Sequence, residues 1–360
     1  MQTGTIKKRL QFILPLLIFF VGCTPAPTRQ APPPSEEETA ILLAYLEGPG
    51  GDLLNSGDVP SLLTPEEVLQ GLTATNQLVI DLRPDSLFLA GHIEHAVNVR
   101  PDGILHYFEQ LIEPNSFERI VLVCSNAMGS AYVNGILRYL GYANVYTLRN
   151  GLSAWRTEIA ADYWLPAMSA HMEGKLETRP HPKNPAGPLP EIATGKSTGY
   201  EILRARAAYL LAERAGKMEV SAAALIANPA DYYLVNYWPK SLYDEGHIEG
   251  SVQYTPRTSL HSEADLFTLP AERPIVIWCY TGHTSAFVVS YLNLLGYEAY
   301  NQIYGANAFI HDSMHAFGIP TRTFDEQTPR DYPLVKSGAQ GPQPETPEIR
   351  TEIQSVEGGC

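Results

Sequence analysis

The chain has 360 residues, of which 44% are hydrophobic and 18% are charged, and its formal net charge is −14. This length predicts two or three domains, and the apolar fraction is that of a globular protein, which excludes global disorder. An acidic surface repels nucleic acid, so we expect no nucleic-acid partner. The four cysteines include no Cys-x-x-Cys pair, which excludes a disulfide scaffold, a zinc finger and a thioredoxin-type motif.

The first 22 residues have the pattern of a secretory signal peptide. Basic residues at 7–9 precede the apolar run LQFILPLLIFFVG, which is shorter than the roughly 20 residues that cross a bilayer. The run ends at Gly22-Cys23, and this junction resembles the lipobox of bacterial lipoproteins. The resemblance implies cleavage before Cys23, attachment of membrane lipid to that cysteine, and an extracytoplasmic protein anchored to the cell envelope, on the periplasmic side of the outer membrane. The alternative is an ordinary secretory signal with an incidental cysteine.

Short motifs recur along the chain at a constant offset. Gly-His-Ile-Glu at 91–94 recurs at 246–249, and Cys124 recurs as Cys279, 155 residues later. This period is far longer than a solenoid repeat of roughly 20–50 residues, so it indicates one whole domain that is duplicated. The predicted segments are a lipid tether with a leading helix (23–50), a first domain (51–165), a Pro-rich linker (166–198), a second domain (199–325) and a disordered tail (326–360).

Each copy is predicted to be an α/β domain. Short apolar runs are typical of buried strands, and the segments between them have helical spacing. Strands that alternate with helices imply a mostly parallel sheet with helices on both faces. The predicted strands are 78–82, 120–123, 145–148 and 274–278; the predicted helices are 132–140, 200–215 and 286–295, with a further helix that begins within 151–156.

Each repeated cysteine ends an apolar strand and precedes a loop of small residues. Main-chain N–H groups and a helix N-terminus at such a place stabilise a thiolate or a persulfide. The segments GHIEHAVNV with CSNAMGSA, and GHIEGSVQYTP with CYTGHTSA, resemble the rhodanese (sulfurtransferase) family. The resemblance implies two rhodanese-like domains and a carrier that takes sulfane sulfur from a donor and passes it to an acceptor thiol, without a cofactor.

Cys279 is the candidate nucleophile, because it can attack a sulfane-sulfur donor and hold the sulfur covalently. Cys124 is the second candidate. Gly282 permits a positive φ, whereas Ala127 at the equivalent position would be strained by roughly 1 kcal/mol. The predicted persulfide- and substrate-binding residues are Tyr280, Thr281, Gly282, His283, Thr284 and Ser285.

The two copies differ in the residues that surround their loops. The first keeps Asp81 and Arg83, which brace the fold in the family, whereas the second has Asn236 and Trp238. Neither loop contains Lys or Arg. We therefore expect a dianionic donor to be weakly held and thiosulfate activity to be low.

Other interpretations stay open or are excluded. The alternative function is a catalytically degenerate binding or scaffold module on the cell envelope, because a fold does not fix a function. A redox pair of Cys124 and Cys279 requires a Cα–Cα distance within roughly 7 Å. Phosphatase activity is excluded because neither loop supplies an arginine to clamp a phosphate. His92 and His247 are expected to make structural hydrogen bonds, and no metal site is predicted.

Overall fold

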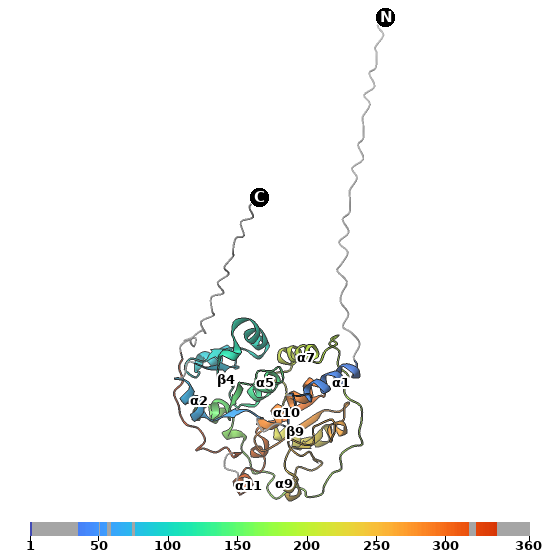
Figure 1. Ribbon diagram of the computed structural model, residues 1–360. Coiled ribbons are helices and arrows are strands. Elements are labelled where there is room, and N and C mark those ends of the chain that lie inside the picture. The colour runs from blue at the N-terminus through green and yellow to red at the C-terminus, as the bar shows by residue number, and fades with distance from the viewer. Residues whose placement is uncertain (2–34, 50, 56–58, 74–75, 317–321, 337–360) are drawn as a thin grey trace. The chain divides into compact units, whose positions relative to one another are not determined.

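The computed structural model of the chain describes residue 1 and residues 35–49, 51–55, 59–73, 76–316 and 322–336 (Figure 1). Residues 2–34, which contain the rest of the expected signal peptide, Cys23 and the first part of the expected tether, lie outside the described residues, as does Cys360. Within the described part of the chain, the helices are too short or too polar to cross a bilayer.

Two five-stranded sheets, each fully parallel, share one topology. The strand order is β1-β5-β4-β2-β3 in the first sheet and β6-β10-β9-β7-β8 in the second. The register repeats too, because Leu62 pairs with Thr147 in the first sheet and Glu219 pairs with Asn301 in the second. The predicted duplication is therefore confirmed. The strands are β1 (Leu62–Leu63), β2 (Gln77–Asp81), β3 (Val97–Asn98), β4 (Arg119–Val123), β5 (Val145–Leu148), β6 (Glu219–Val220), β7 (Tyr233–Asn236), β8 (Val252–Gln253), β9 (Ile275–Trp278) and β10 (Ala299–Gln302).

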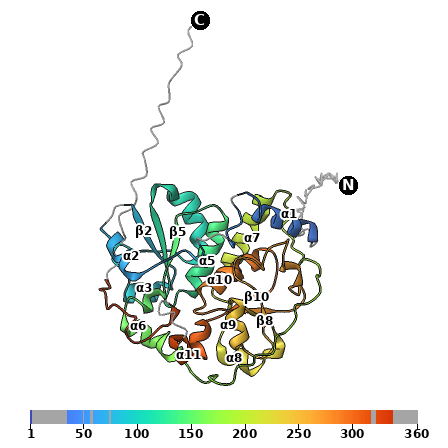
Figure 2. The ribbon, with the colours of Figure 1, turned by 60° about the horizontal axis from the view of Figure 1, so that its bottom comes forward.

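Helices cover both faces of each sheet (Figure 2). In β2, Ile80 belongs to the core that α5 covers, and Val79 faces the core that α2 and α3 cover. Burial on both faces explains why the strands are continuous apolar runs. The helices are α1 (Glu36–Leu46), α2 (Pro65–Gly71), α3 (Asp85–Ala90), α4 (Ile104–His106), α5 (Met128–Tyr139), α6 (Thr157–Asp162), α7 (Gly199–Glu213), α8 (Ala222–Ala227), α9 (Lys240–Glu245), α10 (His283–Leu294) and α11 (His311–Ala316).

The two helices that follow the cysteine loops, α5 and α10, pack against each other (Figures 1 and 2). A Cβ on Gly135 of α5 would lie 2.1 Å from Oγ of Ser290 on α10, so the close approach requires glycine. The rings of Tyr139 and Phe287 extend the contact, with centroids 5.8 Å apart. Both helices were predicted, and each begins a few residues earlier than its apolar spacing indicates.

Both extended segments that flank the second domain pack on a domain. In the linker, Glu177 pairs with His247 as an antiparallel bridge. The predicted disorder from residue 326 is wrong for residues 326–336, since Val335 forms the corresponding bridge with His92 of the first domain. The indole of Trp155 also donates to the Pro333 carbonyl at 3.0 Å. Main-chain hydrogen bonds hold this segment, and composition gives no signal of them. The remainder of the tail, 337–360, lies outside the described residues.

Candidate active site

Cys279 lies directly after β9, at the edge of the sheet where the carboxyl ends of the parallel strands meet. The chain turns through Gly282 and enters α10. Gly282 has a φ of 87°, and a Cβ on it would lie 3.1 Å from the Tyr304 nitrogen and 2.6 Å from Sδ of Met128. The turn therefore requires glycine for its positive φ and for the close approach of both neighbours.

A short 3-10 turn, Gly305–Ala308, holds the main chain of the cysteine. The Ala306 N–H donates to the Cys279 carbonyl at 2.9 Å. A Cβ on Gly305 would lie 2.4 Å from that carbonyl oxygen, so glycine is required here as well. This contact fixes the position of Cys279 independently of its side chain.

The first domain repeats this support. The Leu152 N–H donates to the Cys124 carbonyl at 2.9 Å. The helix predicted to begin within 151–156 is found as the short 3-10 turn Gly151–Ser153, and the α-helix α6 begins only at Thr157. Gly151 has a φ of 63° and is pressed against the cysteine loop, which prevents a regular helix at this point.

The sulfur of Cys279, a residue that is 2% exposed, has two polar neighbours. The Gly282 N–H donates to Sγ at 3.3 Å, and Oγ of Ser285 lies 3.2 Å away. The Ser285 hydroxyl donates to Oδ1 of Asn301 at 2.6 Å, so the thiol donates to Ser285. Nδ2 of Asn301 is buried and has no hydrogen-bond partner among the described residues. A half-turn of the Asn301 carboxamide presents that nitrogen to Ser285 and frees the hydroxyl proton for a thiolate.

Cys279 also lines two adjoining pockets, of about 290 Å³ and about 210 Å³. The pockets share Tyr280, Thr284 and Arg322, which belong to the second domain, with Pro60 from the first. The first domain also contributes Leu54 and Val59 to the larger pocket, and Leu62 and Arg149 to the smaller one. The site of the second domain is therefore completed by the first.

Three arginines line these pockets: Arg257 and Arg322 in the larger, Arg149 and Arg322 in the smaller. The guanidinium of Arg322 lies over the Tyr280 ring, 4.4 Å from its centroid. None of the described residues that line either pocket carries a carboxylate, although the chain has a net charge of −14. A weakly held anionic donor was expected because the loop after Cys279 contains no Lys or Arg. The pocket cations come instead from other segments of the chain.

The sequence analysis missed all three arginines. Arg149 follows β5, and Arg257 lies beyond the end of β8. Because the carboxyl ends of parallel strands meet at one edge, a charged residue soon after a strand was a usable signal for both. Arg322 lies beyond α11, and no local pattern indicates its position.

His283 joins the two domains and does not supply a cation to the loop. Its Nε2 accepts the Asn150 N–H of the first domain at 3.2 Å, and its Nδ1 lies 2.7 Å from Oγ1 of Thr281. Burial, helped by the Arg149 guanidinium, lowers the pKa of His283 to about 3. The ring is therefore neutral near pH 7.

The structure brings the predicted loop residues together around Cys279. Tyr280 and Thr284 line both pockets, while Thr281 and His283 line the smaller one. Gly282 and Ser285 contact the sulfur directly. Polar groups of the loop thus surround Cys279, and the two pockets that it lines contain three arginines.

Cys124 has the equivalent position after β4 but different surroundings. Oγ of Ser130 lies 3.3 Å from its sulfur, and Oδ1 of Asn126 accepts the thiol proton at 3.7 Å. That same oxygen accepts the Met128 N–H at 3.0 Å. The Asn126 carboxamide oxygen thus takes the Met128 N–H that could otherwise point to the sulfur. The same oxygen accepts the thiol proton and so favours the protonated thiol of Cys124.

The backbone and the charge near Cys124 also disfavour a thiolate. Ala127 has a φ of 77°, the left-handed conformation expected to be strained there. Burial raises the pKa of the Cys124 thiol, and the Glu219 carboxylate adds to the rise, while Ser130 acts in the opposite direction. Cys124 and Cys279 are both free thiols in the structure.

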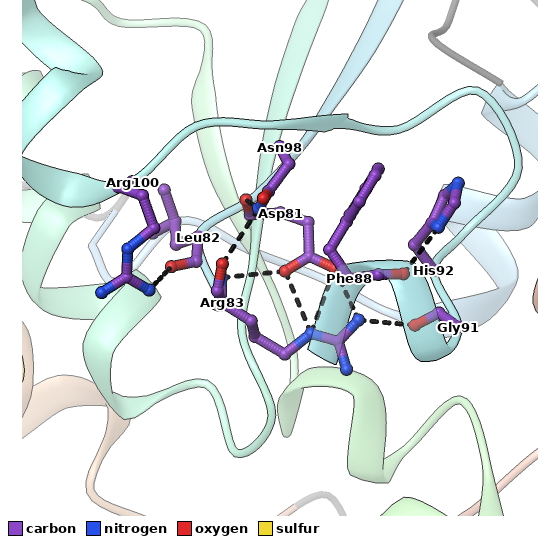
Figure 3. Close-up of polar contacts among 8 residues, drawn as sticks. All are labelled: Asp81, Leu82, Arg83, Phe88, Gly91, His92, Asn98 and Arg100. Atoms are coloured by element: carbon purple, nitrogen blue, oxygen red, sulfur yellow. Dashed lines mark hydrogen bonds and ion pairs between the residues drawn. The ribbon is translucent and has the colours of Figure 1, made fainter. Parts of the chain in front are cut away.

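Asp81 and Arg83 form a buried ion pair that braces the first domain (Figure 3). Nη2 of Arg83 lies 2.7 Å from the Asp81 carboxylate and donates to the Gly91 carbonyl at 2.6 Å. Nearby, Nδ1 of His92 lies 2.8 Å from the Phe88 carbonyl. The expected structural roles of this pair and of the motif histidine are therefore confirmed.

The second domain replaces the ion pair with aromatic packing. Oδ1 of Asn236 accepts the Trp238 N–H at 3.2 Å, as Asp81 does for Arg83. The Trp238 ring stacks on Tyr280 beside Cys279, with centroids 5.0 Å apart. The second domain therefore keeps the side-chain to main-chain hydrogen bond but replaces the ion pair with packing of Trp238 on Tyr280.

Comparison with known proteins agrees with this geometry. A family model described as a rhodanese-like domain matches residues 64–158 and 221–312, together just over half of the chain. The thiosulfate sulfurtransferase GlpE of Shewanella oneidensis is 28% identical over 93 residues, or 26% of this chain and 89% of that protein. The GlpE of Pseudomonas fluorescens is 28% identical over 100 residues, or 27% of this chain and 87% of that protein.

Among solved structures, the 3-mercaptopyruvate sulfotransferase SseA from Escherichia coli is 17% identical, with a TM-score of 0.24. The similarity covers 68% of this chain and 98% of that one. The two ranges matched by the family model contain both cysteines and the helices α5 and α10. The chain belongs to the rhodanese family, as a sulfurtransferase-type protein with two rhodanese-like domains.

Proposed function

We propose that Cys279 carries sulfane sulfur as a persulfide and passes it to a thiol or another nucleophile. The observation that carries this proposal is the position of the thiol, in a wall shared by two pockets that contain three arginines and no described carboxylate. Guanidinium groups bind oxyanions through charge-assisted hydrogen bonds. The named relatives are thiosulfate sulfurtransferases, and thiosulfate is an anion of this kind.

In the first half-reaction, the Cys279 thiolate attacks the outer sulfur of the donor. A new S–S bond forms to Cys279 as the donor's own S–S bond breaks. With thiosulfate, sulfite leaves with the electron pair, and the charge on each side of the equation is equal. Arg257 and Arg322 bind the oxyanion end of the donor, which lowers the cost of bringing an anion to a thiolate.

In the second half-reaction, an acceptor nucleophile attacks the terminal sulfur of the persulfide. The S–S bond to Cys279 breaks, and the thiolate is restored with the bonding electron pair. The Gly282 amide stabilises that thiolate as the leaving group, and the Ser285 hydroxyl joins it once the Asn301 carboxamide has turned. This is nucleophilic catalysis with a covalent intermediate.

The test is intact-protein mass spectrometry after incubation with thiosulfate and removal of the small molecules. We expect wild-type protein and Cys124→Ser to gain the mass of one sulfur atom, which cyanide then removes as thiocyanate. Cys279→Ser should gain nothing. An adduct that persists in Cys279→Ser would assign the carrier to another thiol. If wild-type protein forms no adduct with thiosulfate, polysulfide or 3-mercaptopyruvate, the chain is a binding module.

We also propose that membrane lipid attached to Cys23 anchors the protein to the cell envelope. The support is the apolar run that ends at Gly22-Cys23, with the first described helix beginning at Glu36. The test is fractionation of cells that express the full chain, with mass analysis of the N-terminal peptide. Wild-type protein should lie in the membrane fraction with a diacylated Cys23, and Cys23→Ala should not. An unmodified N-terminal peptide in wild-type protein would contradict the anchor.

A further inference from the structure

The linker carries two side chains toward a buried histidine of the second domain. Glu177 and His247 exchange main-chain hydrogen bonds of 3.0 and 2.9 Å. Four residues later, His181 pairs with Val252 of β8, and its N–H donates to the Tyr243 hydroxyl at 3.0 Å. The backbone thus places all three side chains before any ligand binds.

The side chains of Glu177, His181 and His247 converge on one point. Oε1 of Glu177 lies 2.6 Å from Nε2 of His181 and 3.8 Å from Nε2 of His247, and the three ligand atoms lie within 4.8 Å of one another. The Gly250 N–H donates to the same carboxylate oxygen at 2.7 Å and fixes its orientation. The side chain of His247 is fully buried, while 22% of His181 and 19% of Glu177 are exposed.

Both ring nitrogens of His247 face oxygen atoms. Its Nδ1 lies 2.8 Å from the Tyr243 carbonyl, which only accepts, so Nδ1 carries a proton. Its Nε2 lies 3.1 Å from the Arg179 carbonyl and 3.8 Å from the Glu177 carboxylate, which also only accept. In the neutral ring, a nitrogen lone pair would therefore face two oxygens. Either a second proton or a metal ion resolves this conflict.

The first domain supplies an internal comparison. Nδ1 of His92, the equivalent of His247, lies 2.8 Å from the Phe88 carbonyl, but Nε2 of His92 has no hydrogen-bond partner among the described residues. Val335 pairs with His92 where Glu177 pairs with His247. Both motif histidines make the same Nδ1 contact with a backbone carbonyl. Only the second domain's His247 also has a carboxylate, Glu177, and a second histidine, His181, beside it among the described residues.

We propose that Glu177, His181 and His247 bind one divalent transition-metal ion of the zinc class, which fastens the linker to the second domain. Two imidazoles and one carboxylate are a known ligand set for Zn²⁺, whereas Ca²⁺ and Mg²⁺ prefer oxygen ligands alone. Tetrahedral Zn²⁺ separates its ligand atoms by roughly 3.3 Å. Here Oε1 of Glu177 lies 2.6 and 3.8 Å from the two imidazole nitrogens and all three atoms lie within 4.8 Å, so Glu177 and His181 must move slightly apart to admit the ion. The Nδ1 contact of His247 with a backbone carbonyl is the outer support that metal-bound histidines usually have.

The site is separate from the sulfur chemistry, since none of its three residues lines either pocket at Cys279. The sequence analysis predicts no metal site, because the ligands lie in two segments that are distant along the chain. Local spacing gives no signal for such a set.

The experiment is calorimetric titration of chelator-treated full-length protein with ZnCl₂, together with metal analysis after gel filtration. We expect one Zn²⁺ per chain, and binding at least about tenfold weaker in His181→Gln and in Glu177→Gln. Both variants change partly exposed linker residues, so the buried His247 stays in place. The matched control is His171→Gln, because His171 lies in the same linker and its ring has a single polar partner in the described part of the chain, the Ser169 hydroxyl. This control should bind zinc as wild-type protein does.

Two further measurements separate the possible outcomes. Zn²⁺ should raise the melting temperature of wild-type protein and of Cys279→Ser, but not that of His181→Gln. Sulfur loading of His181→Gln should equal that of wild-type protein, so the metal proposal and the sulfur-carrier proposal fail independently. Equal zinc affinity in His181→Gln and wild-type protein, or no binding to either, would overturn the site.

Discussion

The main-chain N–H of Asn150 donates to Nε2 of His283 at 3.2 Å, across the boundary between the two domains. His283 follows Gly282, whose N–H contacts the sulfur of Cys279. The first domain therefore supports the loop that carries Cys279 in the second. This contact between the domains requires a neutral His283, because its Nε2 accepts the Asn150 N–H and the ring is buried.

Acid should weaken the fold through His283. The pKa of His283 is lowered to about 3, whereas histidine in an unfolded chain titrates near about 6.5. The unfolded state therefore binds the proton first, and the stabilisation present above pH ~6.5 is lost as the pH falls toward 3. Between pH 7 and pH 4.5, the free energy of unfolding measured in urea should fall more for wild-type protein than for His283→Gln. Equal losses would show that His283 titrates in the same way in both states.

The arginines should determine affinity for an anionic donor more than turnover. We expect Arg322→Gln and Arg257→Gln each to raise the KM for thiosulfate roughly tenfold, about 1.4 kcal/mol, with a smaller change in kcat. The difference from wild-type protein should shrink as salt screens the charges. Steady-state kinetics at two ionic strengths measure both effects.

Arg273→Gln is the matched control for these variants. Arg273 donates to the main-chain carbonyls of Ala230 and Tyr232 and lines neither pocket. Its KM should equal that of wild-type protein. A rise as large as that of Arg322→Gln would mean that net charge, and not the pocket, controls donor binding.

The two loops should respond in opposite ways to exchange of glycine and alanine. Gly282→Ala places a methyl group at a φ of 87°, against Met128 and the Tyr304 nitrogen, and should destabilise the fold by roughly 1–2 kcal/mol while slowing sulfur loading. Ala127→Gly relieves a φ of 77° and should stabilise the fold by up to about 1 kcal/mol. Denaturant unfolding gives both values. Stabilisation by Gly282→Ala would contradict the tight turn.

Cys124 should react slowly with alkylating agents near pH 7. Burial and the Glu219 carboxylate raise its pKa, and the thiolate is the reactive form. In the Cys279→Ser background, the pH profile of iodoacetamide modification should move to lower pH when Glu219→Gln is added. Peptide mapping assigns the modified residue. Rapid modification below pH 8 without the second substitution would make Cys124 an active thiol.

The strands and the cysteine loops could be predicted because their signals are local. The run at 145–148 coincides with β5, and the strand before Cys279 was placed within one residue. The positive φ at Gly282 also follows from sequence alone, because the repeat aligns it with the turn before a helix.

The charge of the pockets could not be predicted, because it depends on contacts between segments that are distant along the chain. Arg149 and Arg322 meet at Cys279 only after the two domains have packed. The fixed path of residues 326–336 was missed for a similar reason. Tyr332 and Leu334 pack on the core of the first domain, and composition does not reveal such a docking surface.

The path of the chain makes the two halves interdependent. Leu54, Val59, Pro60 and Leu62 supply walls to the pockets of Cys279, and after Arg322 the chain returns to pair Val335 with His92. A cut at the linker would leave the first domain without the segment that pairs Val335 with His92. It would leave the pockets of Cys279 in the second domain without the wall that the first domain supplies. Neither half therefore keeps all of its contacts when the chain is divided, and the two domains function as one unit of structure.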